Sequence, residues 1–216
     1  MIIDINKYWK YVDLWYHRAL RSHLVGCRSV LDVGCGSKSP IRYIKKNFYS
    51  EGIDIFKPSI IESKKKKIHD KYVLGDIQKL DMYYRPRSFD AVIALDVLEH
   101  FKSIDALKLV KMIERVARKK VIILTPNGHH LDMVCEGDKN NLFQKHKSGW
   151  FKKDLEDLGY KVFGLRGLKY IRNENATIKS KPWIFWGLIA FLSEPILYFV
   201  PDLSYDLFAV KNISHD

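Results

Sequence analysis

Short apolar segments alternate with segments of helical periodicity along most of this chain, and the alternation restricts the folds open to it. Strands are expected at 29–33, 51–56, 71–76, 89–97, 119–126, 160–167 and 205–212. Helical patterns lie between them, at 41–48, 58–68, 107–117 and 149–159. Strands that are apolar throughout are typical of a parallel sheet buried on both faces. The pattern therefore predicts a doubly wound α/β fold with helices on both faces of the sheet.

The composition fits one domain over 1–216, because 216 residues with 47% hydrophobic content can bury a sizeable core. An amphipathic helix is expected within 1–24. The three cysteines form no C-x-x-C pair, so neither a disulfide framework nor a zinc site is indicated. No export signal is apparent, and we expect a cytoplasmic protein. The net charge of +12 favours anionic partners without naming one.

The stretch VLDVGCGSKSP at 30–40 is an apolar strand that ends in a turn with two glycines. Gly34 and Gly36 lack a Cβ, so a ligand can approach the backbone closely. A dinucleotide fingerprint needs glycine or alanine where this chain has Ser39. A phosphate-binding P-loop needs four residues after the first glycine, then glycine, lysine and serine or threonine, and CGSKSP does not fit that spacing. Asp32 would repel a pyrophosphate and attract a cationic ligand.

Four motifs in order, VLDVGCG, GIDIF, LGDIQ and ALDVLEH, resemble the cofactor site of class I S-adenosylmethionine-dependent methyltransferases. The resemblance spans about 28–165 and extends to the closing strand at 205–212. It implies a Rossmann-like sheet of seven strands, the last antiparallel, and a methyltransferase enzyme with S-adenosylmethionine as cofactor. The cofactor-binding residues that it implies are Asp32, Gly34, Gly36, Asp54, Ile55, Asp76, Ile77 and Asp96. Asp54 would hold the ribose hydroxyls, and Asp76 with Ile77 would face the adenine.

Candidate catalytic bases are His100 and His146, because an oxygen acceptor must lose a proton during methyl transfer. Each also has a structural interpretation, as a turn residue or a loop-packing residue, and His129 and His130 are rivals. D-x-x-E-H at 96–100 is similar to a pattern of quinone-biosynthesis O-methyltransferases in which a divalent metal is implicated. Carboxylates and an imidazole are suitable ligands, but glutamate–histidine is common here without metal, so we assign no metal ligands.

The acceptor stays open, although two features limit it. The proline pair typical of DNA amino-methyltransferases is missing after 89–97, and the apolar segment 178–201 is interrupted at Ser193, Glu194 and Pro195. The segment is expected to be a lid over an apolar pocket, a membrane-surface contact through 183–200, or a dimer interface. We expect methyl transfer to a small lipophilic or lipid-linked acceptor, chiefly on oxygen. The alternatives are an RNA methyltransferase and a non-catalytic nucleotide-binding protein.

Overall fold

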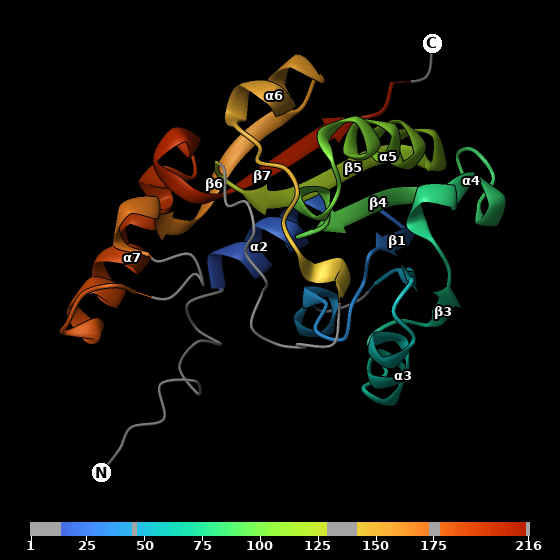
Figure 1. The fold of residues 1–216 in the computed structure, drawn as a ribbon, viewed down its shortest axis with the longest axis horizontal. Coiled ribbons are helices and arrows are strands. Elements are labelled where there is room, and N and C mark those ends of the chain that lie inside the picture. The colour runs from blue at the N-terminus through green and yellow to red at the C-terminus, as the bar shows by residue number, and fades with distance from the viewer. Residues whose placement is uncertain (1–13, 45–46, 129–141, 173–177, 215–216) are drawn as a thin grey trace.

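A computed structural model describes residues 14–44, 47–128, 142–172 and 178–214. It contains a seven-stranded sheet in the order β3-β2-β1-β4-β5-β7-β6 (Figure 1). The strands are β1 (Ser29–Val33), β2 (Tyr49–Asp54), β3 (Lys71–Leu74), β4 (Phe89–Leu95), β5 (Ala117–Pro126), β6 (Lys161–Leu168) and β7 (Ser204–Asn212). Strands β1 to β5 pair in parallel, whereas β7 is antiparallel to both β5 and β6. The predicted Rossmann-like sheet with an antiparallel last strand is confirmed.

The strand order reverses at β1, which pairs with β2 on one side and β4 on the other. In sheets of this kind, ligands bind beyond the carboxyl ends of the strands at such a reversal. The loops that follow β1, β2, β3 and β4 therefore meet where a ligand site is expected.

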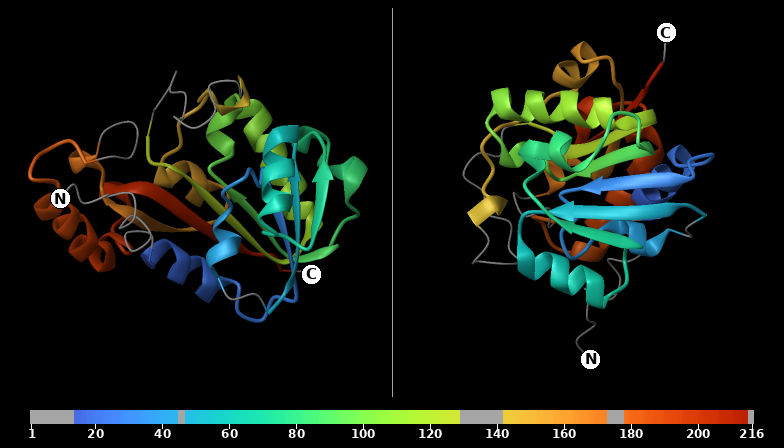
Figure 2. Two further views of the ribbon diagram at one scale, coloured as in Figure 1. Left: turned by 90° about the horizontal axis from the view of Figure 1, so that it is seen from below. Right: turned by 90° about the vertical axis from the view of Figure 1, so that its right-hand side faces the viewer.

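Helices cover both faces of the sheet (Figure 2). They are α2 (Leu14–His23), α3 (Lys57–Lys65), α4 (Leu80–Tyr83), α5 (Ser103–Val116), α6 (Lys152–Asp157) and α7 (Trp183–Leu197). Alternate side chains of β4 enter two separate hydrophobic clusters, because successive strand residues point to opposite faces. Val92 packs in the cluster that holds Ile113 of α5, and Ile93 packs in the cluster that holds Leu20 of α2.

The prediction of a helix at 41–48 is wrong. The described part contains only a 3-10 turn, Pro40–Tyr43, and Ile44 already has an extended backbone. Ile41 and Ile44 are both buried, and β2 begins at Tyr49, so few residues remain for a longer helix.

Helix α7 packs against the edge strand β6, at the opposite end of the sheet from β3 (Figure 1). Two glycines of β6 make this approach close: a Cβ on Gly164 would lie 2.3 Å from the Leu197 carbonyl oxygen, and one on Gly167 would lie 3.0 Å from Ala190 Cβ. Among the described residues, no helix has the length and apolar character needed to cross a membrane. The first part of the N-terminal helix predicted at 1–24 lies outside the described residues.

Candidate functional site

A cavity of about 460 Å³ opens beyond the carboxyl ends of β1 to β4. It is lined by Gly34, Asp54, Ile55, Asp76, Ile77, Gln78, Asp96, Val97, His100, Phe101, Lys102, Asp105, Phe143, Gln144 and Lys147. The lining contains residues of all four sequence motifs. The structure thus brings together segments that are far apart along the chain.

The turn after β1 depends on its two glycines. Gly34 has φ +70° and Gly36 has φ +52°, values that side chains with a Cβ adopt at a cost. A Cβ on Gly34 would also lie 2.7 Å from Val97 Cγ2, so the turn and the loop after β4 are in close contact. Gly34 lines the cavity, where the absence of a side chain leaves the backbone accessible.

Asp54 ends β2 and holds the neighbouring backbone with both carboxylate oxygens. Oδ2 accepts a hydrogen bond from Gly36 N at 2.9 Å, and Oδ1 accepts one from Phe56 N at 2.8 Å. Burial raises the pKa of the Asp54 carboxyl above its ordinary value, and these N–H donors act in the opposite direction. Ile55, the next residue, is 39% exposed and lines the same cavity.

Asp76 and Ile77 follow β3 and form the next part of the wall. Asp76 Oδ1 accepts a hydrogen bond from Gln78 N at 3.0 Å and caps a 3-10 turn, Ile77–Lys79. Ile77 is buried but still contributes to the lining, and its side chain packs in the core beneath. The hydrogen bond of Asp76 and the buried side chain of Ile77 therefore hold the backbone after β3, where the adenine is predicted to bind.

Asp96 follows β4 with a left-handed backbone, φ +55°. Its Oδ2 lies 3.5 Å from Arg166 Nη2, and Arg166 Nη1 lies 2.8 Å from Asp206 Oδ2. Arg166 has φ +61° at an irregularity in β6. Strained residues of this kind persist where the surroundings hold them in place, often at functional sites. The sequence motifs gave no sign of this Asp96–Arg166 pair, which joins residues 70 positions apart.

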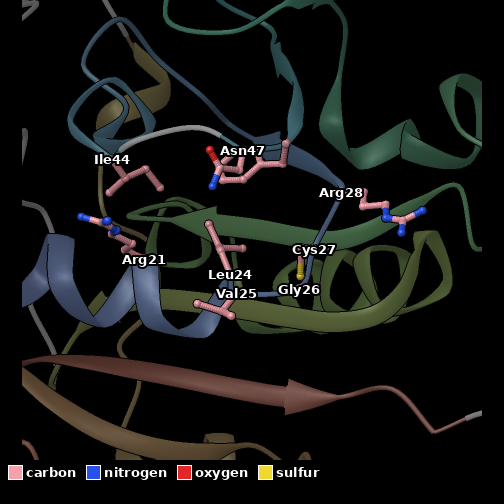
Figure 3. Close-up of a pocket in the computed structure, with 9 residues that line it drawn as sticks. Arg21, Leu24, Val25, Gly26, Cys27, Arg28, Ile44 and Asn47 are labelled. Carbon is pink, nitrogen blue, oxygen red and sulfur yellow. The ribbon is translucent and has the colours of Figure 1, made fainter.

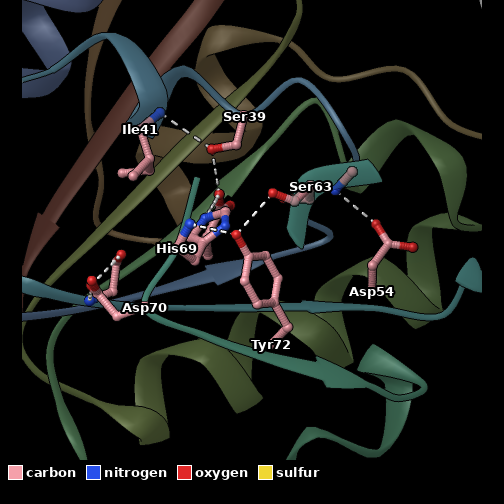
Figure 4. A network of polar contacts seen from close by, with 10 residues as sticks. Ser39, Ile41, Asp54, Ser63, His69, Asp70 and Tyr72 are labelled. Atoms are coloured by element: carbon pink, nitrogen blue, oxygen red, sulfur yellow. Dashed lines mark hydrogen bonds and ion pairs between the residues drawn. The ribbon is translucent and has the colours of Figure 1, made fainter. Parts of the chain in front are cut away.

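Asp32 is buried beneath the turn and is absent from the cavity lining. Its Oδ2 accepts a hydrogen bond from Ser39 Oγ at 2.5 Å and lies 2.9 Å from His69 Nε2 (Figure 4). The direct cofactor contact predicted for Asp32 stays a prediction. The contacts with Ser39 and His69 give the Asp32 carboxylate a structural role beneath the turn.

The two predicted catalytic histidines lie side by side, with ring centroids 5.0 Å apart. His100 and His146 are both buried, and His100 Nδ1 lies 3.4 Å from the Lys145 carbonyl oxygen. The loop that contains His146 is held next to Glu99, whose carbonyl oxygen accepts hydrogen bonds from Lys147 N and Ser148 N. Burial lowers the pKa of His100 to about 4, and His146 adds to the effect. His129 and His130 lie outside the described residues.

Glu99 completes a compact group with these histidines. Glu99, His100 and His146 each offer one ligand atom, and these atoms lie within 4.8 Å of one another. Thr125 Oγ1 donates a hydrogen bond to Glu99 Oε2 at 3.1 Å. Burial raises the pKa of Glu99 well above its ordinary value, and the nearby Asp96 charge acts in the same direction. One carboxylate oxygen and two imidazole nitrogens are a donor set that suits a divalent transition metal.

A second cavity, of about 500 Å³, lies at the other end of β1 (Figure 3). It is lined by Arg21, Leu24, Val25, Gly26, Cys27, Arg28, Ile44, Asn47 and Phe48. These residues lie near the amino ends of β1 and β2 and include none of the predicted site residues. The larger cavity is therefore not the candidate site.

The remaining lining residues come from two stretches that carry no motif. Phe101, Lys102 and Asp105 follow ALDVLEH, and Phe143, Gln144 and Lys147 belong to the loop that holds His146. Their only signal in the sequence is position, directly after the fourth strand or beside a candidate histidine. No described residue of 178–201 lines this cavity.

Comparison with known proteins identifies the domain. Residues 31–125 match a family model described as a methyltransferase domain, and no curated protein matches the chain. A SAM-dependent methyltransferase from Archaeoglobus fulgidus is 18% identical with a TM-score of 0.56, covering 95% of this chain and 99% of that one. The methyltransferase domain of bacterial CtHen1 is 17% identical with a TM-score of 0.57, covering 94% and 100%.

Magnesium protoporphyrin IX methyltransferase from Synechocystis PCC 6803, solved with bound SAM, is 16% identical with a TM-score of 0.54. The match covers 98% of this chain and 85% of that one. At such identities these likenesses show the fold, whereas the family match and the order of the motifs identify the kind of domain. Residues 31–125 therefore match a methyltransferase domain, and the sheet as a whole has the fold of S-adenosylmethionine-dependent methyltransferases.

Proposed function

We propose that this methyltransferase methylates an oxygen atom of a small lipophilic or lipid-linked acceptor. The observation that carries the proposal is the His100–His146–Glu99 group, because His100 lines the cavity that holds the cofactor motifs and the other two side chains lie next to it. Bound S-adenosylmethionine supplies a sulfonium-activated methyl group for in-line displacement. The chain must align the acceptor with that group, exclude water and accept the acceptor proton.

The cofactor roles follow the positions of the side chains. Asp54 would accept the ribose hydroxyl donors, because a carboxylate is an acceptor for two hydroxyls at once. Asp76 and Ile77 would hold the adenine, and the backbone at Gly34 would admit the methionine end. Asp96, at the other side of the cavity, would face the positively charged part of the cofactor. Each of these residues lines the cavity, which supports the assignment.

His100 is the residue we assign to the acceptor proton, since its side chain lines the cavity and its ring is oriented by the Lys145 carbonyl. His146 would support it from the neighbouring loop. Glu99, His100 and His146 also fit a divalent metal, as argued from their donor atoms. A metal held there would act as a Lewis acid that makes an acceptor hydroxyl easier to deprotonate.

The apolar surface of α7 supports a lipophilic acceptor and a peripheral membrane contact. Large apolar side chains on this helix and the residues after it are exposed, notably Ile184, Leu192, Ile196 and Phe199. Glu194 is the one charged residue between 183 and 200, and it is buried. A group of large exposed apolar side chains on one helix is characteristic of an interaction surface. Lys179 and Lys181 flank its amino end, where they would meet anionic headgroups.

RNA is the second candidate acceptor. Asp54, Asp76 and Asp96 are assigned to the cofactor, so the charged residues of the lining that remain for the acceptor are Asp105, Lys102 and Lys147. The net charge of +12 also favours a polyanion. The acceptor screen therefore includes RNA.

The test begins with calorimetric binding of S-adenosylmethionine and S-adenosylhomocysteine to the wild type and to Asp54→Ala, with NAD and ATP as controls. Loss of ribose contacts should weaken binding by at least tenfold, because one hydrogen bond to a charged group contributes about 1.5 to 3 kcal/mol. Asp105→Ala, in the same lining but outside the motifs, should bind the cofactor as the wild type does.

Acceptor screening follows with phenols, quinols, fatty acids and short RNAs, read by mass spectrometry of the methylated product. We expect methyl ethers or esters of apolar acceptors, lost in His100→Ala. Activation by added Mn²⁺, Zn²⁺ or Mg²⁺ after chelation would assign the metal role, and unchanged rates would assign His100 alone. Methylated RNA without any apolar product would contradict the proposal.

A further inference from the structure

A buried histidine supports the cofactor turn from below. His69, in the loop between α3 and β3, places Nε2 2.9 Å from Asp32 Oδ2, and both side chains are almost completely buried, 0% and 3% exposed. Ser39 Oγ donates to the same oxygen at 2.5 Å (Figure 4). Two donors thus converge on one carboxylate oxygen, and one of them comes from a segment 37 residues away.

The imidazole reaches Asp32 because β2 has a glycine in its path. Strand β2 lies between β1 and β3 in the sheet. A Cβ on Gly52 would lie 2.9 Å from His69 Nδ1 and 2.8 Å from Cys35 Sγ, distances that real Cβ atoms do not tolerate. Any larger residue at this position would displace the imidazole or the residue after Gly34.

The loop that carries His69 is itself fixed on both sides. His69 N donates to the Tyr72 hydroxyl at 2.8 Å, and that hydroxyl donates to the Ser63 carbonyl at 2.9 Å. Asp70 Oδ2 accepts from Ser50 N at 2.7 Å and from Ser50 Oγ at 2.9 Å. Because α3 and β2 both hold the loop, His69 has little freedom to leave Asp32.

The turn at 34–39, which follows β1, is held at two points. Gly36 N donates to Asp54 Oδ2, and Ser39 Oγ bridges Asp32 and the backbone N of Ile41. Since a ligand binds more tightly to a preorganised loop, fixing these points favours cofactor binding. We propose that His69 is a positioning residue for S-adenosylmethionine, acting through Asp32 and Ser39 on the turn at 34–39. The proposal rests on the cofactor role of that turn.

The test compares two polar variants of His69 that differ in the length of the side chain. The amide of His69→Gln can reach the position of Nε2 and keep a donor for Asp32, whereas the shorter amide of His69→Asn cannot. We expect His69→Asn to weaken S-adenosylmethionine binding by on the order of tenfold in calorimetry, and His69→Gln to stay within about twofold of the wild type. In an Asp32→Asn background, His69→Asn should have no further effect.

Tyr84→Phe is the control, because it removes a buried hydrogen bond to the Glu51 carboxylate in β2 and leaves the hydrogen bonds of Asp32 and Ser39 in place. It should lower the melting temperature and leave the dissociation constant unchanged. Wild-type affinity in folded His69→Asn, equal losses in both His69 variants, or multiplied losses in the Asp32→Asn background would each overturn the proposal. Failure of the wild type to bind S-adenosylmethionine would instead remove the cofactor role on which it rests.

Discussion

Gly34 combines two constraints that can be separated experimentally. Its φ of +70° is strained for any L side chain, and a Cβ there would also collide with Val97. Gly26 has a similar φ, +80°, but no atom within 4 Å of a built Cβ. Gly26→Ala therefore has the backbone strain alone and is the natural control for Gly34→Ala.

We expect Gly26→Ala to cost about 1 kcal/mol of stability, the usual price of a left-handed alanine. Gly34→Ala should cost more, since contact with Val97 is added, and it alone should weaken S-adenosylmethionine binding. The double variant Gly34→Ala/Val97→Ala should recover only the steric part of the loss. Urea denaturation and calorimetry measure the two effects, and equal stability losses in the two single variants would contradict this account.

Glu194 of helix α7 is a buried titratable residue near strands β6 and β7. The side chain is buried next to Arg172, Asp206 and Arg166, and burial raises its pKa to about 7 despite the favourable Arg172 charge. An acid whose pKa is raised by folding keeps its proton up to a higher pH in the folded state than in the unfolded state. Its contribution to stability is full below about pH 4.5 and is lost as the pH rises through about 7.

Glu194→Gln removes this titration, so the variant should gain stability relative to the wild type as the pH rises from 5 to 8. Between these two pH values the gain should be about 2.5 kcal/mol, because each pKa unit corresponds to about 1.36 kcal/mol and part of the loss has already occurred at pH 5. Urea unfolding at pH 5 and pH 8 measures the difference. Glu156→Gln, the same substitution at an exposed position, serves as the control. A wild-type and variant difference that is the same at both pH values would refute the assignment.

The exposed face of α7 makes a separate prediction at the scale of one element. Leu192→Glu and Ile196→Glu change side chains that are 62% and 69% exposed, so folding should be unaffected. Binding to vesicles that contain anionic phospholipid should fall at least tenfold in sedimentation, because each charge must leave water to enter the interface. Met82→Glu, at a site 76% exposed in α4, should bind as the wild type does. Unchanged vesicle binding with loss of a dimer in ultracentrifugation would assign the face to a second copy.

At the scale of the whole molecule, the net charge of +12 separates nonspecific from specific binding. Retention of RNA through scattered lysines and arginines should fall by orders of magnitude between about 0.05 and 0.5 M salt, because counterion release drives it. The affinity for S-adenosylmethionine should change less than about twofold, since one small ligand releases few ions. RNA binding that persists at the higher salt concentration would show a built RNA site instead.

Local patterns were enough to predict the sheet and much of the cavity. Apolar runs identify strands, and the motif carboxylates Asp54, Asp76 and Asp96 stand at strand ends, so the parallel sheet brings them together. Pairs such as Arg166 with Asp96 and His69 with Asp32 are different. Each depends on how distant segments cross, and no motif around Arg166 or His69 marks either residue as a partner. The helix predicted at 41–48 was wrong because β2 begins at Tyr49 and leaves little room after the turn at Pro40–Tyr43, which the local spacing does not reveal.

The contact across Gly52 also limits which sequences related chains can carry. A methyl group at this position and an imidazole at position 69 compete for the same space, since the built Cβ falls 2.9 Å from His69 Nδ1. Relatives that keep histidine here should therefore keep glycine in the second strand, and those that gain a side chain at 52 should have lost the histidine. The two positions are expected to covary, although 17 residues separate them in the chain.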